Sequence, residues 1–115
     1  MTTAGITAVS KYEFDQPFQR KIAALTLRDN GFATQTDGLV LPEYFENQSD
    51  AVLVSIGLAY FRKFKAVPTP VSMVELIKNA IVSKRIRKDM IEEVKTSYKE
   101  MFAMDLSDKA FMALS

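Results

Sequence analysis

The sequence predicts an all-α protein, a compact single-domain bundle of about five to six helices. Two observations lead to this fold class. Apolar residues recur three or four positions apart along most of the chain, which is typical of helices that bury one face. Proline, asparagine, serine and threonine precede several of these stretches, and such residues start or cap helices. A length of 115 residues suits one domain with a core of its own.

We expect a flexible leader over residues 1–13, which is rich in small residues, and a helical domain over residues 14–115. The first helix should hold Pro17 in its first turn. Asp29-Asn30-Gly31 should end it, because glycine suits the left-handed conformation that follows many helices. Its buried side should carry Phe18, Ile22 and Leu25, and its solvent side Arg20, Lys21 and Arg28.

A short connection leads to the next long helix. Residues 32–38 are expected to form one helical turn or a compact loop, and residues 39–41 should return the chain to the core. Pro42 then starts a single turn, whose Tyr44 and Phe45 are both expected to fill the core.

The longest helix should start at Asn47 or Ser49, which are both good N-cap residues, and run to about Lys65. Asp50 adds a carboxylate to its first turn, where the helix dipole favours negative charge. Gly57 costs about 1 kcal/mol relative to Ala in a helix interior, which suggests that another backbone crosses closely there. The expected buried stripe is Leu53, Ile56, Tyr60 and Phe64, widened by Val52, Ala59 and Val67.

Two further helices follow an extended elbow at Pro68-Thr69-Pro70. The first should start near residue 71, capped by Thr69 or by Ser72 with Glu75, and end at about Ser83. A last helix should open at Lys109. The helix that starts near residue 71 should bury Val74, Ile77 and Ile81. The helix after it should bury Met90, Val94, Tyr98 and Met101.

The composition excludes several kinds of chemistry. Cysteine and histidine are absent, which removes disulfides, Cys nucleophiles, His bases and metal sites built on thiolate or imidazole. The glycine loop of P-loop ATPases is absent too. We therefore expect no enzyme activity, cofactor or metal in this chain. Residues 51–61 form the longest apolar run, shorter than the roughly 20 residues that span a bilayer, so we expect a soluble, cytoplasmic protein without membrane contact.

The densest basic cluster is Lys84, Arg85, Arg87 and Lys88. It is a candidate for contact with phosphates or with an acidic partner surface. The alternative is structural, because basic residues after a helix C-terminus interact favourably with its dipole, and neighbouring carboxylates cancel much of the field.

A second candidate surface is apolar and lies late in the sequence. Met104, Phe111, Met112 and Leu114 have little remaining chain to pack against, so a partner is expected to cover them. The alternative is that the methionines fill the core.

Four motifs follow one another along the chain: Phe18-Gln19 with Ile22, Leu25, Leu27 and Asp29; Pro42-Glu43-Tyr44-Phe45-Glu46-Asn47; Tyr60-Phe61 with Lys63-Phe64; and Val67-Pro68-Thr69. The helix after the last motif has a leucine, Leu76, near its start. This order resembles the N-terminal domain of DnaB-type replicative helicases, especially those encoded by phages. The resemblance covers about residues 14–112 and rests on pattern and order.

The resemblance implies a collar domain that assembles a dimer or hexameric ring in the full-length protein and docks primase or a helicase loader in the bacterial host cell. ATP and Mg²⁺ would belong to a separate motor domain that this chain lacks, and contact with DNA would be weak or indirect. The family's subunit-pairing hairpin would begin at Ser107. Two other hypotheses stand beside it: a small helical DNA-binding regulator that uses residues 70–90, and a stand-alone phage adaptor that targets the host helicase.

Overall fold

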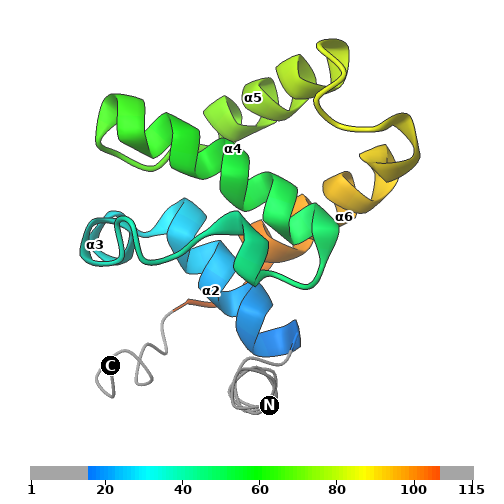
Figure 1. The fold of residues 1–115 in the computed structure, drawn as a ribbon. Coiled ribbons are helices and arrows are strands. Elements are labelled where there is room, and N and C mark those ends of the chain that lie inside the picture. The colour runs from blue at the N-terminus through cyan, green and yellow to red at the C-terminus, as the bar shows by residue number, and fades with distance from the viewer. Residues whose placement is uncertain (1–15, 107–115) are drawn as a thin grey trace, which may run out of the picture.

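Helix α4 (Gln48–Phe64) runs through the middle of the structure and contacts the other long helices (Figure 1). The computed structural model describes residues 16–106, with side chains from residue 18 onward. Five helices and two 3-10 turns, without strands, make up this part of the chain, which confirms the all-α prediction. The other elements are α2 (Gln16–Arg28), α3 (Asn30–Gln35), η1 (Pro42–Tyr44), α5 (Pro70–Val82), η2 (Lys88–Met90) and α6 (Ile91–Ala103). The expected leader and the expected helix from Lys109 lie outside the described residues.

Side chains at the helix starts account for where α4 and α5 begin. The Asn47 side-chain oxygen accepts a hydrogen bond of 3.0 Å from the Asp50 backbone N–H. The Thr69 hydroxyl accepts one of 3.1 Å from the Ser72 N–H, and Pro70 follows as the first helical residue. Each bond satisfies a backbone donor that has no partner within its helix. The predicted caps are therefore confirmed, with Thr69 rather than Ser72 at the start of α5.

The prediction for the end of α2 is wrong in one respect. Asp29 has an extended backbone and accepts a 2.9 Å hydrogen bond from the Phe32 N–H, so it caps a new helix, α3. Gly31 lies inside that helix and does not have a positive φ angle. The N-cap preference of aspartate therefore outweighs the tendency of glycine to end a helix here.

The stripe that α4 buries differs from the predicted one. Leu53 is fully buried as expected, but Ile56 and Tyr60 are only partly buried, and Phe64 is 54% exposed. The buried face lies to one side of the predicted stripe, because α2 and α6 pack there while α5 covers the neighbouring face incompletely (Figure 1). This buried face consists of Ser49, Asp50, Leu53, Val54, Gly57, Leu58 and Phe61.

Gly57 permits close packing, although the group that meets it is a side chain and not the predicted backbone. A Cβ atom at this position would lie 2.0 Å from Cδ2 of Leu27, on α2. Leu27 is fully buried in the core. The missing side chain of Gly57 thus leaves the space that Leu27 fills.

The connection between α3 and α4 also departs from expectation. Phe45 is buried as predicted, but Tyr44 is 62% exposed. Tyr44 ends the 3-10 turn and Phe45 follows it with an extended backbone (φ −94°, ψ 124°), so the two rings point in different directions. Leu39 is 67% exposed as well, and it lies at the end of the turn that contains Gly38, whose φ is +82°.

Candidate interaction surfaces

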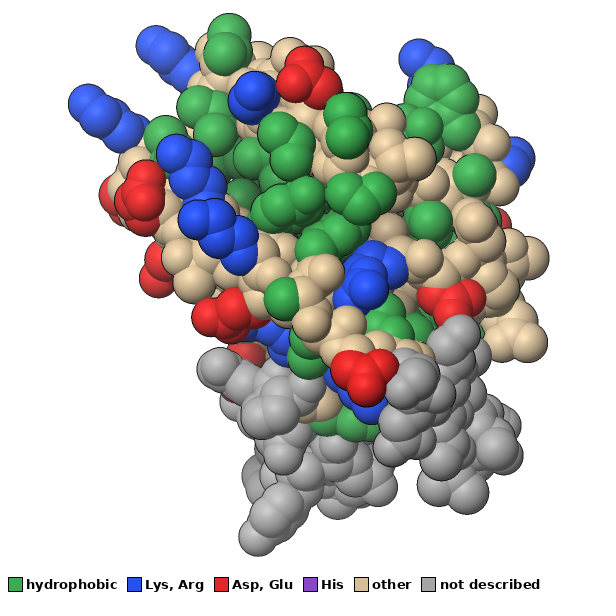
Figure 2. Space-filling view, turned by 180° about the vertical axis from the view of Figure 1, so that it is seen from behind, with side chains coloured by type: hydrophobic (Ala, Val, Ile, Leu, Met, Phe, Trp, Pro, Cys, Tyr) green, Lys and Arg blue, Asp and Glu red, His purple; other side chains and the backbone are tan. Residues whose placement is uncertain are grey.

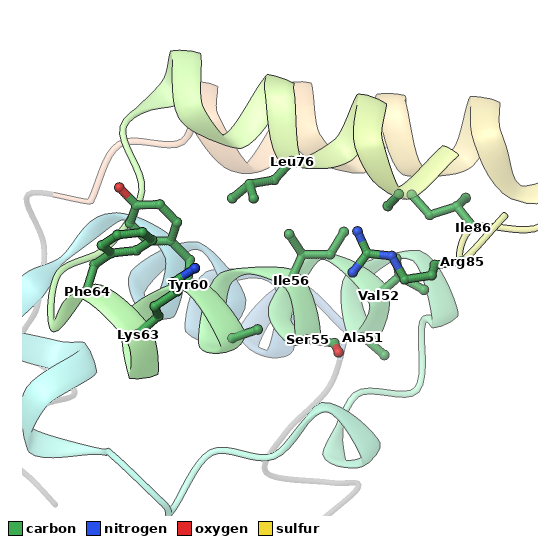
Figure 3. Close-up of a pocket in the computed structure, with 12 residues that line it drawn as sticks. Ala51, Val52, Ser55, Ile56, Tyr60, Lys63, Phe64, Leu76, Arg85 and Ile86 are labelled. Carbon is green, nitrogen blue, oxygen red and sulfur yellow. The ribbon is translucent and has the colours of Figure 1, made fainter. Parts of the chain in front are cut away.

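The face of α4 that α5 leaves partly uncovered forms a groove of about 490 Å³ between the two helices (Figure 3). Its lining is mainly aliphatic and aromatic. Leu76 projects from α5 towards α4, on which Ile56 projects towards α5 (Figure 3). The residues that line the groove are Ala51, Val52, Ser55, Ile56, Ala59, Tyr60, Lys63, Phe64, Leu76, Ala80, Arg85 and Ile86.

A basic side chain stands at each end of this α4–α5 groove (Figure 3). Lys63 lies beside the paired rings of Tyr60 and Phe64, and its Nζ is 5.4 Å from the centre of the Phe64 ring. At the other end, the Arg85 Nε donates a 3.1 Å hydrogen bond to the Ser83 hydroxyl. No carboxylate is among the residues described as lining the groove, so its charge is entirely positive.

The predicted basic cluster lies in the loop between α5 and α6, and all four of its side chains are exposed. Their contacts differ from one residue to the next. Arg85 faces the groove, while Arg87 pairs with Asp89 at 3.4 Å and donates a long hydrogen bond to Gln48. Lys84, with a left-handed backbone (φ 63°), and Lys88 have no carboxylate within ion-pair distance among the described residues.

Of the predicted apolar surface, only Met104 falls within the described range; Phe111, Met112 and Leu114 lie outside it. Met104 is partly buried against the core. Its backbone oxygen and that of Met101 each accept a 2.8 Å hydrogen bond from Arg28, whose guanidinium also lies 5.7 Å from the centre of the Phe102 ring. Arg28, expected in solvent, therefore satisfies carbonyl groups at the end of α6.

The sequence reasoning missed a partly buried cluster of charged residues. Arg20, expected on the solvent side of α2, lies with its Nε and Nη2 each 3.2 Å from an oxygen of Asp50 on α4. Arg20 also donates hydrogen bonds to Glu100 and Ser97, both on α6. One guanidinium thus joins three helices. The sequence analysis explained Asp50 by its position in the first turn of its own helix. Its pairing with Arg20, which lies 30 residues earlier in the chain, was therefore not predicted.

The Asp50 carboxyl is buried, and the Arg20 guanidinium does not fully compensate for the hydration that it loses. Burial raises the pKa of the Asp50 carboxyl above its ordinary value of 3.8, while the Arg20 guanidinium acts in the opposite direction. Oδ1 of Asp50 lies near Arg20 but accepts no well-directed hydrogen bond. Ser49 and Ser97 share a 2.9 Å hydrogen bond, and both side chains are buried, so neither hydroxyl is accessible from the surface. The cluster therefore holds helices together.

The face of the molecule opposite to that of Figure 1 also carries hydrophobic side chains, gathered in its upper part (Figure 2). Lysine and arginine border them, but aspartate and glutamate lie among these basic side chains (Figure 2). This face thus presents both signs of charge, unlike the α4–α5 groove.

Within residues 16–106, no three acidic side chains are grouped so that they could hold a metal ion. The helices of that same range are all too short or too polar to cross a membrane. No family model, curated protein or solved structure matches this chain.

Proposed function

We propose that this chain is the N-terminal protein-interaction and ring-assembly domain of a phage replicative helicase of the DnaB type. In this role it docks primase or a helicase loader during DNA replication and carries no catalysis of its own. The observation that carries the proposal is the order of the four motifs that resemble this family, from Phe18-Gln19 to Val67-Pro68-Thr69.

Contacts between these motifs support treating them as parts of one unit. The Gln19 side chain accepts a 2.9 Å hydrogen bond from the Glu46 backbone N–H and donates one of 3.2 Å to the Glu46 carboxylate. The first motif is thereby joined to the second. The Val67 N–H of the elbow donates a 2.8 Å hydrogen bond to the side chain of Asn30, which follows the end of the first motif.

The test is direct binding of the purified full chain to the primase and the helicase loader of the same phage, by size-exclusion chromatography with light scattering. We expect a complex with one of them. Replacing Phe111 and Met112 together by serine should weaken it, if the predicted apolar surface is the docking site. Replacing the exposed Thr34 and Thr96 by serine serves as the control. Absence of binding to either protein, with no self-association, would contradict the proposal.

The hypothesis of a DNA-binding regulator has one observation in its favour: Lys84, Arg85 and Lys88 are exposed and lack carboxylate partners among the described residues. A DNA-binding measurement distinguishes it. Salt-dependent binding of the chain to duplex DNA, weakened by Arg85→Ala with Arg87→Ala, would favour that function. Capture of a host helicase without primase or loader binding would favour the adaptor hypothesis.

A further inference from the structure

The floor of the α4–α5 groove has the surface relief of a helix-packing site. Residues four positions apart on a helix form a ridge, and the furrow beside it accepts the ridge of a second helix. Here a row of small side chains runs beside a row of large ones, so a helix backbone can approach closely over the small row. The small row is Ala51, Ser55 and Ala59; the large row is Val52, Ile56 and Tyr60.

The length of the groove also suits a helix. It follows α4 from Ala51 to Phe64, which is roughly 20 Å at about 1.5 Å per residue. Three to four turns of helix, or about 13 residues, have this length. The opposite wall is formed by Leu76 and Ala80 on α5, again four positions apart.

The charges at the two ends restrict the occupant further. Lys63 and Arg85 stand at opposite ends of the groove, and neither has a carboxylate within ion-pair distance in the described part of the chain (Figure 3). Lys84 and Lys88 also lack a carboxylate within that distance in the described residues, but they do not line the groove, whereas Lys78 pairs with Glu75 and Lys95 with Glu92. Unpaired positive charges at both ends of an apolar trough favour an occupant with negative charge at both ends.

We propose that the α4–α5 groove binds an amphipathic helix of another protein, about three to four turns long, with an apolar face and acidic residues near both ends. This inference does not depend on the helicase assignment, because it rests on the groove alone. Failure to bind primase or loader would leave it standing.

The experiment is a selection followed by a charge swap. A display library of helical peptides of about 14 residues, with apolar residues at helical spacing and randomised residues near both ends, is selected on the full chain. We expect aspartate and glutamate to be enriched at both ends. The enriched peptide is then synthesised and its affinity measured by fluorescence anisotropy.

Two double variants with the same change in net charge locate the site. Lys63→Glu with Arg85→Glu alters the ends of the groove, whereas Arg62→Glu with Lys84→Glu alters their exposed sequence neighbours, which do not line it. The groove variant should lose about tenfold or more in affinity, and the neighbour variant less than about threefold. A peptide with lysine in place of its acidic ends should regain affinity for the groove variant, which also shows that this variant is folded.

Three results would overturn the proposal. They are selection of no helix, selection without acidic ends, and equal losses in the two double variants. A concentration-dependent dimer of the chain that only the groove variant dissociates would assign the groove to a second copy, which overturns it as well.

Discussion

Helix α4 is apolar on two neighbouring faces, and only one of them is covered by the rest of the fold. The covered face packs against α2 and α6 and includes Leu53 and Phe61, which are 0% and 5% exposed. The other face forms the groove, where Ile56 and Tyr60 are partly buried and Phe64 is 54% exposed.

The difference shows that apolar character alone does not identify the core of this protein. Both faces have apolar residues of similar kinds at helical spacing, so the sequence pattern does not distinguish the buried face from the uncovered one. What separates them is the number of helices that pack on each. Apolar surface that its own fold leaves uncovered is a candidate for binding a partner, and here that surface is also bordered by unpaired basic residues.

The largest expected effect is on the free energy of unfolding, and it distinguishes Phe61 on the covered face from Phe64 on the groove face. Phe61→Ala should lower the free energy of unfolding by about 3–4 kcal/mol, because it removes a buried ring and leaves a cavity. Phe64→Ala, the same change on the groove face, should cost less than about 0.5 kcal/mol. Urea denaturation of both variants and the unaltered chain measures the difference. Equal losses would mean that the groove face is as well packed as the covered one.

The second effect concerns the charged group within the covered face. Arg20→Met should lower the free energy of unfolding by about 2–3 kcal/mol at neutral pH, because the Asp50 carboxylate then stays buried without its counter-charge. The groove face offers the matched control: Lys63→Met removes an exposed cation and should change stability by less than about 0.5 kcal/mol.

The pH dependence of this loss has a definite sign. Burial already raises the pKa of Asp50 in the folded protein above 3.8, and loss of Arg20 should raise it further. The folded variant therefore takes up a proton at a pH where the unfolded chain does not, so its stability increases as pH falls through that raised pKa towards 3.8. The destabilisation by Arg20→Met should shrink in mildly acidic buffer. A constant loss across this range would show that Asp50 does not titrate there.

Local chemistry made much of the fold predictable. The caps at Asn47 and Thr69 bond to backbone groups three residues ahead, so the start of each helix is encoded within one turn. The groove and the Arg20–Asp50 pair depend on how helices cross, and no local pattern records that. The burial of one face of α4 rather than the other was unpredictable for the same reason. Of the predicted basic cluster, only Arg85 lines the groove. The contact of that cluster with phosphates or with an acidic partner stays a prediction.

The smallest expected effect tests whether the contact between Gly57 and Leu27 determines how closely α2 packs on the covered face. Gly57→Ala should lower the free energy of unfolding by about 1 kcal/mol, because overpacking against Leu27 exceeds the roughly 1 kcal/mol that alanine gains in helix propensity. In a Leu27→Ala background the clash is absent, so the same change should stabilise the protein by up to about 1 kcal/mol. A double-mutant cycle by urea denaturation gives both values. If Gly57→Ala has the same effect in both backgrounds, Leu27 does not determine the approach of α2 to α4, and the close packing of this face must come from other contacts.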